Sequence, residues 1–328
     1  MKTDSNFKAQ LAKKAALVEA FLASCLNRFD RPAYPDAGFQ NASPETPGIP
    51  AGLKEAMNYS LLAGGKRIRP VLCISAARLF GLDAAAALPF AAGIECIHSY
   101  SLIHDDLPAM DDDDYRRGRL SNHKKFGEAA AILAGDALLT DAFVFMSGVA
   151  DTGMIAPQNV LKALTSVALA AGSAGMAGGQ FLDMQYTAEP DISLEQLAYM
   201  QAAKTGAMLA ASCHSGALLA GAGEDAASAI NAYGRFLGEA FQIVDDILDE
   251  TGTTEELGKP AGSDAKQGKV TYPSRLGLEK SRDLARAAGT RALAALDKVA
   301  ASRSFSAEAE TELAFLREFV SYLLQRSS

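Results

Sequence analysis

The sequence predicts an all-α protein, and three features of its 328 residues support this prediction. Hydrophobic residues make up 49% of the chain, and their long runs are rich in alanine and leucine, which favour helices. Alternating β-branched residues, the pattern of a half-buried strand, are almost absent. Two clusters of aspartates each follow an apolar, helix-like stretch. We therefore expect a single helical domain over residues 1–328 with a large core.

Helices are expected along most of the chain, with two longer loops between them. The expected helices cover about residues 7–28, 51–63, 88–104, 129–145, 160–171, 193–223, 224–250, 277–300 and 306–325. The helix from Leu88 would hold Pro89 in its first turn, where proline is tolerated. Residues 31–50 contain five prolines and form an expected loop. Residues 252–268 are polar and glycine-rich, and are expected to form a lid over phosphate groups or, alternatively, a disordered surface loop.

Composition excludes several classes of function. The net charge of −8 argues against a nucleic-acid partner and against anchoring to anionic lipid. The N-terminus lacks the hydrophobic region of a signal peptide, and no apolar run is expected to span a membrane. The cysteines stand singly in apolar surroundings and are expected to be reduced thiols: Cys25, Cys73, Cys96 and Cys213. We expect a cytoplasmic protein without a membrane anchor.

The most informative stretch covers residues 100–119 and reads Y-S-L-I-H-D-D-L-P-A-M-D-D-D-D-Y-R-R-G-R. Six aspartates fall between Asp105 and Asp114, and carboxylates this dense repel one another unless a cation is present. Mg²⁺ prefers oxygen ligands and commonly joins carboxylates to substrate phosphates. Arg116 and Arg117 follow directly, and arginine binds phosphate with paired hydrogen bonds. The stretch predicts a diphosphate site with a divalent metal.

A solvated acidic loop is the alternative for this stretch. An EF-hand is excluded, because the glycine and the distal glutamate of its loop do not follow Asp112 and Asp114. A second cluster, F-Q-I-V-D-D-I-L-D at residues 241–249, favours the metal site. Asp245 and Asp249 share one helix face, with Gln242 one turn before Asp245. We expect the two clusters to face each other across a cavity.

Pro108 separates Asp105 from Asp111. A regular helix would turn these two carboxylates apart, whereas a turn interrupted by proline can bring both to one metal. Asp106 lies beside them. The roles of Asp112, Asp113 and Asp114 stay open between ligand, supporting group and solvated side chain.

Basic and polar residues elsewhere suggest where a diphosphate would bind. Lys66-Arg67-Ile68-Arg69-Pro70 opens a helix whose free amide groups favour an anion, although an exposed basic turn is the alternative. His98 lies two turns before Asp105 on roughly the same face. It is expected either to bind a ligand or to be an ordinary core residue. Lys204-Thr205-Gly206 predicts a kink that exposes a carbonyl and a hydroxyl. For Gln180 and Asp183 a close helix–helix contact is the favoured interpretation.

Six motifs occur in order: G-G-K-R-I-R-P, D-D-L-P-A-M-D-D-D-D-Y-R-R-G, G-G-Q-F-L-D-M, K-T-G, F-Q-I-V-D-D-I-L-D and G-K-V-T-Y-P. Together they resemble the trans-isoprenyl diphosphate synthases, most closely the bacterial farnesyl diphosphate synthases, from about Tyr59 to Leu276. The resemblance implies an isoprenoid synthase fold of about ten core helices around a central cavity, usually as a homodimer. It also implies three Mg²⁺ ions when substrate is bound.

The resemblance assigns a role to each matching residue. The metal ligands would be Asp105, Asp106, Asp111, Asp245 and Asp249. The allylic diphosphate (dimethylallyl or geranyl) would contact Arg116, Lys204 and Lys259. Isopentenyl diphosphate would contact Lys66, Arg69, His98 and Arg117. Thr205 and Gln242 would direct oxygens at the developing carbocation, and Lys269 would assist from the lid side.

Tyr100 and Ser101 are the residues expected to set product length. Tyr100 precedes Asp105 by five residues, which places it about 7.5 Å along the helix. A growing prenyl tail would meet this ring, so growth should stop at fifteen carbons, while the small Ser101 would not stop it at ten. The alternative for Tyr100 is an ordinary core aromatic. The product expected is (2E,6E)-farnesyl diphosphate.

Three alternatives stay open. A ten- or twenty-carbon product would need only different bulk around Tyr100, Ser101 and Ile97. A terpene cyclase would carry a different metal triad in place of D-D-I-L-D and would not need Lys66 and Arg69. A regulatory subunit without activity would ordinarily have lost aspartates that are intact here.

Overall fold

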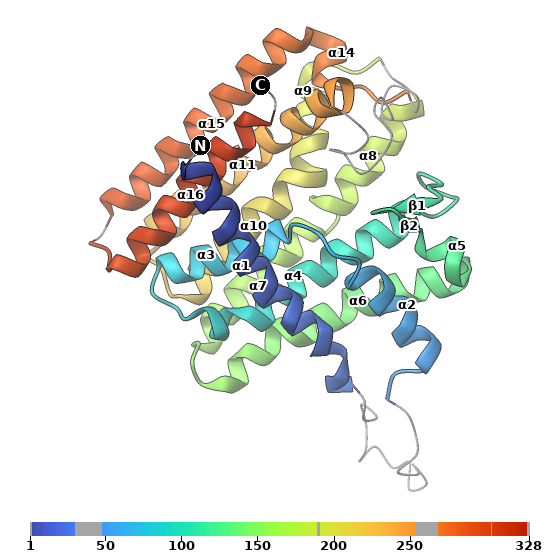
Figure 1. Cartoon of the computed structure of the whole chain (residues 1–328), viewed down its shortest axis with the longest axis horizontal. Helices are drawn as coiled ribbons and strands as arrows, with labels where there is room; N and C mark the ends of the chain where they lie inside the picture. Colours follow the sequence, from blue (N-terminus) through green and yellow to red (C-terminus); the bar gives the residue numbers. More distant parts are fainter. Residues whose placement is uncertain (1, 30–47, 189–190, 253–267, 303, 327–328) are drawn as a thin grey trace, which may run out of the picture.

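The computed structural model describes residues 2–29, 48–188, 191–252, 268–302 and 304–326 (Figure 1). Its helices are α1 (Lys2–Cys25), η1 (Leu26–Phe29), α2 (Ala51–Leu61), α3 (Ile68–Leu79), α4 (Ala84–Asp105), α5 (Asn122–Phe126), α6 (Glu128–Ser147), η2 (Gly148–Thr152), α7 (Pro157–Ala171), α8 (Met176–Ala188), α9 (Leu194–Gln201), η3 (Ala202–Gly206), α10 (Ala207–Leu219), α11 (Glu224–Thr251), α14 (Tyr272–Leu276), α15 (Leu278–Ala301) and α16 (Ala307–Gln325). Within these ranges the only strands are β1 (Tyr115–Arg116) and β2 (Arg119–Leu120), an antiparallel pair. The prediction of an all-α fold is confirmed.

α4, which carries the first aspartate cluster, begins earlier than predicted. Asp83 caps its N-terminus and accepts a hydrogen bond from the Ala85 amide at 2.8 Å. Pro89 therefore lies inside the helix, and its predicted place in the first turn is wrong. The run of alanines from Ala84 to Ala87 is the physical reason, because alanine has the highest helix propensity and extends the helix ahead of the proline.

Two hydrophobic clusters form the interior, one on each side of a shared middle layer. The first joins α11, α15 and α16, and the second joins α4, α6 and α7, as the grouping of these helices in Figure 1 illustrates. α3 and α10 contribute side chains to both clusters. α10 approaches α3 closely, because a Cβ on Gly216 would lie 2.2 Å from the Cys73 carbonyl oxygen. The two aspartate clusters therefore come from opposite halves of the fold.

The four cysteines are free thiols and all are buried, as predicted for reduced core residues. Within the described residues, three helical stretches are long and apolar enough to cross a membrane, by length and composition: Ala84–Asp105, Glu128–Thr152 and Pro157–Thr187. No membrane-spanning stretch is predicted from the sequence. The difference arises because core helices of an all-α fold are apolar around most of their surface. α4 is such a helix, because 67% of its apolar stretch is buried inside the protein.

Both long loops of the sequence analysis fall largely outside the described residues. Residues 30–47 and 253–267 lie outside the residues that the structure describes. The loop at 31–50, the lid at 252–268 and the role of Lys259 therefore stay predictions.

Candidate active site

A cleft of about 740 Å³ opens where the C-terminal end of α4 faces α11. It brings together side chains from the α2–α3 loop, α4, β1, α8, η3, α11 and the segment before α14. The predicted site residues that line it are Lys66, Asp105, Asp111, Arg116, Arg117, Lys204, Thr205, Gln242, Asp245 and Lys269. Both aspartate clusters thus reach one cleft, as the spacing predicts.

The chain after α4 folds back so that Asp105 and Asp111 lie at the same cleft wall. The Asp111 amide donates a hydrogen bond to the Asp105 carbonyl oxygen at 2.9 Å, and the Asp112 amide donates to the Leu107 carbonyl oxygen at 3.1 Å. Asp112 adopts a left-handed backbone with φ of 49°. Burial raises the pKa of Asp105 to about 6, although the charge of Lys204 opposes this. Binding of an additional cation would therefore stabilise the ionised form of the Asp105 carboxyl group.

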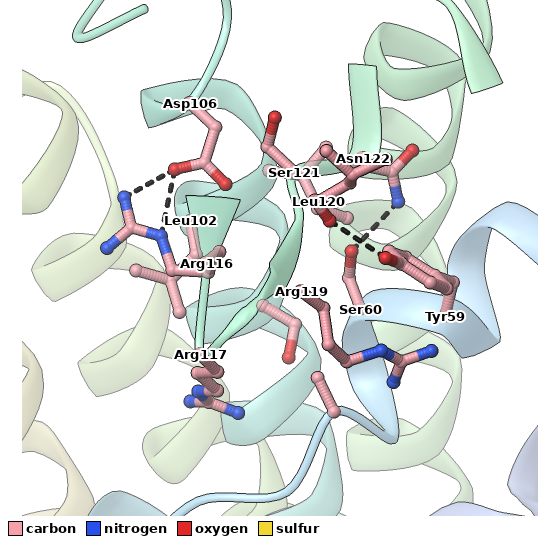
Figure 2. A pocket seen from close by; sticks show the side chains of 13 residues that line it. Tyr59, Ser60, Leu102, Asp106, Arg116, Arg117, Arg119, Leu120, Ser121 and Asn122 are labelled. Atoms are coloured by element: carbon pink, nitrogen blue, oxygen red, sulfur yellow. Dashed lines mark hydrogen bonds and ion pairs between the residues drawn. The ribbon is translucent and has the colours of Figure 1, made fainter. Parts of the chain in front are cut away.

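Asp106 is not among the described residues that line this cleft; it lines a small neighbouring hollow, where Figure 2 shows it facing Arg116. Arg116 donates to its Oδ1 from Nε at 2.8 Å and also from Nη2. A further ion pair joins Arg116 Nη2 to Asp113 Oδ2 at 3.3 Å. Burial alone would lower the pKa of Arg116, but Asp106 raises it. In this structure Asp106 orients Arg116, and a metal-binding role for Asp106 stays a prediction.

The hairpin that carries Arg116 and Arg117 is attached to α2. Tyr59 donates a hydrogen bond to the Leu120 carbonyl oxygen at 2.8 Å (Figure 2). Asn122 donates to Ser60 Oγ at 2.8 Å. The guanidinium of Arg119 lies 4.1 Å from the centre of the Tyr59 ring, a cation–π contact. These contacts hold the two arginines at the cleft.

On the opposite wall, Asp245 and Asp246 of α11 have different partners. Asp245 lines the cleft and lies 3.9 Å from Nη1 of Arg326, at the end of α16. Asp246 is buried and accepts hydrogen bonds from Gln201 at 2.9 Å and from the Tyr272 amide at 3.0 Å. It therefore attaches α9 and α14 to α11.

Two further members of this cluster lie differently. Gln242 lines the cleft, but its amide nitrogen donates to Asp246 Oδ1 at 3.2 Å. Asp249 is buried and is not among the described residues that line the cleft. Its metal-binding role stays a prediction. Arg326 was missed by the sequence analysis, because a basic residue near the chain end carries no motif.

The predicted break at Lys204-Thr205-Gly206 is present as a π-helical turn, η3, between α9 and α10. Lys204 Nζ lies 2.6 Å from Asp183 Oδ2 of α8. Lys269 Nζ lies 3.5 Å from Asp111 Oδ1 and 3.9 Å from Asp183 Oδ2. Burial would lower the pKa of Lys204, but Asp183 and Asp105 together raise it.

Asp183 is not among the site residues predicted from the sequence, because a helix–helix contact is the favoured interpretation of its segment. That contact exists, since a Cβ on Gly179 would lie 2.2 Å from the Lys204 amide nitrogen. The same close approach brings Asp183 to Lys204. Within the described residues, the buried amide atoms of Gln180 have no hydrogen-bond partner.

A separate group of cations surrounds the start of α3. Burial lowers the pKa of Arg69 and of Arg117, and each lies near other arginines. Burial, Arg69 and Arg117 hold the pKa of His98 well below 6.5, so the ring is neutral. No hydrogen-bond partner for the buried Nε of Arg69 occurs in the part of the chain that the structure describes. This group is suited to an anion.

The residues predicted to set product length lie away from the diphosphate end of the cleft. Tyr100 packs edge-on against His104, with ring centroids 5.7 Å apart, and contacts the second hydrophobic cluster. It is not among the described residues that line the cleft. Ser101 donates to the His98 carbonyl oxygen at 3.0 Å.

The donor set fits Mg²⁺ only together with a substrate. No group of three histidine, cysteine or acidic side chains in the described ranges is close enough to hold a metal by itself. Asp105, Asp111 and Asp245 nevertheless present carboxylates to one cleft. Mg²⁺ commonly takes one or two carboxylates and completes its octahedron with water and phosphate oxygens. These residues therefore suit an ion bridged to a diphosphate.

Comparison with known proteins identifies the family. Residues 50–303 match the family model described as polyprenyl synthetase. The chain belongs to the polyprenyl synthetase family. It is therefore a prenyltransferase of the trans-isoprenyl diphosphate synthase type, as the motifs indicated.

Relatives with curated descriptions agree. Geranylgeranyl pyrophosphate synthase 12 of Arabidopsis thaliana is 48% identical over 241 residues, covering 73% of this chain and 67% of the relative. Dimethylallyltranstransferase of Fischerella ambigua is 47% identical over 237 residues, covering 72% and 68%. An FPP/GFPP synthase from Zymomonas mobilis has a solved structure that superposes with a TM-score of 0.76 at 33% identity, covering 98% of this chain and 99% of that one. The predicted isoprenoid synthase fold is confirmed.

Proposed function

We propose that this prenyltransferase condenses isopentenyl diphosphate head-to-tail with dimethylallyl, geranyl and farnesyl diphosphates to give geranylgeranyl diphosphate. The observation that carries the condensation chemistry is the meeting of both aspartate clusters in one cleft with cations that include Lys66, Arg117, Lys204 and Lys269. One group, around Lys204, adjoins the carboxylates and suits an allylic diphosphate with its metal. The other group reaches the cleft through Lys66 and Arg117, whereas Arg69 and His98 lie near Arg117 but are not among the described residues that line the cleft. It suits the second diphosphate.

The charges explain how the chain promotes ionisation. As the allylic C–O bond breaks, negative charge develops on the leaving diphosphate, and Lys204, Lys269 and Arg116 stabilise it. Bound Mg²⁺ would add Lewis-acid stabilisation of the same oxygens, held by Asp105, Asp111 and Asp245. Thr205 on the π-helical turn directs polar atoms into the cleft beside the developing cation. The double bond of isopentenyl diphosphate then attacks, and a proton leaves to the released pyrophosphate.

Two product lengths have specific support. The geranylgeranyl product is favoured by curated relatives described as geranylgeranyl pyrophosphate synthases at 47–49% identity. The farnesyl product is the second candidate and depends on Tyr100, a bulky ring one and a half turns before Asp105. The solved relative described as an FPP/GFPP synthase also supports it.

A product assay tests both the chemistry and the length. Enzyme, Mg²⁺, isopentenyl diphosphate and dimethylallyl diphosphate are incubated, and the products are separated by chain length. Tyr100→Ala is compared with Tyr199→Ala, a tyrosine that is 59% exposed on α9. A twenty-carbon product from the wild type supports the main proposal. A fifteen-carbon product that lengthens only in Tyr100→Ala supports the farnesyl alternative. Absence of condensation contradicts the proposed function.

We also propose that the chain forms a homodimer through α6, α7 and α8. Large apolar side chains are exposed on these helices: Ile132, Leu133, Val144, Leu161, Leu169 and Phe181. α6 and α7 also border an open groove of about 480 Å³ that Phe143, Val144 and Leu164 line. Such a patch ordinarily marks an interaction site. Light scattering of the wild type and of Leu169→Glu would test it, with a monomeric variant as the expected result.

A further inference from the structure

Arg67 stands in the middle of the basic segment 64–70, but its side chain turns away from the cleft. Its side chain is fully buried, and its backbone is left-handed with φ of 48°. Lys66, the residue before it, is exposed and lines the cleft. A left-handed backbone is unfavourable for a residue other than glycine. The surroundings of Arg67 must therefore stabilise this conformation.

The guanidinium of Arg67 has a partner at each nitrogen. Nε lies 2.6 Å from Glu19 Oε1 of α1, and Nη1 lies 2.6 Å from Glu95 Oε1 of α4. Nη2 donates to the Leu61 carbonyl oxygen at the end of α2, at 2.7 Å. Three helices are thus joined through one side chain. The segment between α2 and α3 is held in place relative to α4.

Glu95 has a wider effect on the isopentenyl side of the cleft. Its side chain is only 2% exposed, and it lies one helical turn before His98. Burial lowers the pKa of Arg69 and of Arg117, whereas the Glu95 charge opposes this for both. Glu95 is therefore a buried carboxylate that stabilises three arginines at once.

Arg117 depends on the same segment. Its Nη1 donates a hydrogen bond to the Gly64 carbonyl oxygen. A Cβ on Gly65 would lie 3.0 Å from Arg117 Cζ, and the backbone of Gly65 has φ of 136°. The side chain of Arg117 consequently rests on the backbone of the segment, and a shift of the segment would move Arg117 as well as Lys66 and Arg69.

We propose that Arg67 and Glu95 are positioning residues for isopentenyl diphosphate: their buried ion pair sets the relative places of Lys66, Arg69 and Arg117 without touching the substrate. The proposal rests on the function proposed above. The alternative is an ion pair that contributes to stability alone, as many buried pairs do. Kinetics separate the two, because a purely stabilising pair leaves the Michaelis constants unchanged.

The test compares Glu95→Gln with a matched control, Glu312→Gln. Glu312 is 3% exposed and lies 2.6 Å from Lys14 of α1 and 3.1 Å from Arg78, in the last turn of α3. Glu312 belongs to α16, so this buried carboxylate joins α16 to α1 and α3, and it is not among the described residues that line the cleft. The KM of isopentenyl diphosphate should rise about tenfold in Glu95→Gln, with that of the allylic substrate within about twofold. Glu312→Gln should lower the Tm and leave both KM values unchanged.

Arg67→Lys provides a second variant should Glu95→Gln fail to fold. Lysine keeps the charge but has a single nitrogen, so it cannot contact Glu19, Glu95 and Leu61 together. The same selective rise in the KM of isopentenyl diphosphate is expected. The proposal is wrong if these variants lose only thermal stability, or if the KM values of both substrates rise together.

The outcome for the wild type separates this proposal from the proposed function. If the wild type condenses substrates and the variants keep its KM values, only the positioning role is wrong. If the wild type does not condense them, the proposed function is wrong, and binding of inorganic pyrophosphate is measured by calorimetry without metal. Affinity weaker by about tenfold in Glu95→Gln would still support positioning, and equal affinity would overturn it.

Discussion

The two groups of cations in the cleft differ in how their charge is balanced. On the allylic side both lysines within the described residues face a carboxylate: Lys204 lies 2.6 Å from Asp183, and Lys269 lies 3.5 Å from Asp111. Asp183 and Asp105 raise the pKa of Lys204 in spite of its burial. These cations are already neutralised before any substrate arrives.

On the isopentenyl side the cations face one another. Burial, followed by the charge of neighbouring arginines, lowers the pKa of His98 well below 6.5. Burial lowers the pKa of Arg69 and of Arg117 too, and Glu95 is the carboxylate that most opposes this in both. The arrangement carries electrostatic repulsion that an anion would relieve.

This difference in charge balance indicates whether each diphosphate needs a divalent metal in order to bind. A diphosphate entering the isopentenyl side gains from unneutralised cations directly. On the allylic side it competes with Asp183 and Asp111 for the lysines, so it gains little unless a divalent metal also binds the carboxylates. We therefore expect metal-independent binding on one side and metal-dependent binding on the other.

The largest effect is expected from Asp105→Asn, which removes one carboxylate of the allylic side. Condensation should fall about a thousandfold or more, and chelation of divalent metal should have a similar effect. Metal-free binding of isopentenyl diphosphate, measured by calorimetry, should stay within about twofold of the wild type. Asp114→Asn is the matched control, because Asp114 belongs to the same acidic run but pairs with Lys124 at 2.7 Å on the surface. Equal losses in both variants would contradict the comparison.

A smaller effect is expected from Asp183→Asn, which removes the carboxylate that Lys204 contacts. Without this partner Lys204 loses its position, so kcat should fall about tenfold. The released charge should also strengthen metal-free binding of inorganic pyrophosphate several-fold, measured by calorimetry. Asp297→Asn, which breaks the exposed pair with Arg317 at 2.6 Å, should change neither quantity. Unchanged pyrophosphate affinity in Asp183→Asn would show that Lys204 is not restrained by Asp183.

The smallest effect concerns His98 and the pH dependence of stability. The pKa of His98 is lower in the folded protein than its ordinary value of 6.5, so the unfolded chain binds the proton more readily. Stability should therefore fall as pH drops below about 6.5, by up to about 1.4 kcal/mol per pH unit. His98→Gln should show a shallower decline in denaturant unfolding. At pH 7.5 and above its stability should depend on pH as that of the wild type does. Parallel curves at every pH would contradict a neutral His98.

Local patterns predicted several features correctly. The helix predicted to begin at about residue 193 does begin there, at a capping box in which Ser193 and Gln196 are bonded to each other's backbone. The interruption at Lys204-Thr205-Gly206 follows from a glycine and a β-branched residue within a helix, and it is a π-helical turn. Such features depend on neighbours in the chain, so the sequence contains what is needed to find them.

Residues whose role depends on distant partners were not predicted. Arg67 and Arg69 are two residues apart in the same motif, yet Arg67 pairs with Glu95, whereas Arg69 belongs to the group of cations around His98. Asp106 likewise turns from the metal side to Arg116. The residue types give no indication of this, because side-chain direction at a loop is decided by what packs against it.

The sequence by itself determined the helical class, the family and the identity of the charged groups that meet in the cleft, because periodicity and motif spacing are local and composition is additive. The tertiary structure alone decided which charges are neutralised. Asp183, Glu95 and Arg326 lie far along the chain from the cations and carboxylates they face, and only the packing of α4, α8, α11 and α16 brings them within a few ångströms. Electrostatic energy depends on distance and burial, and neither quantity is contained in the order of residues.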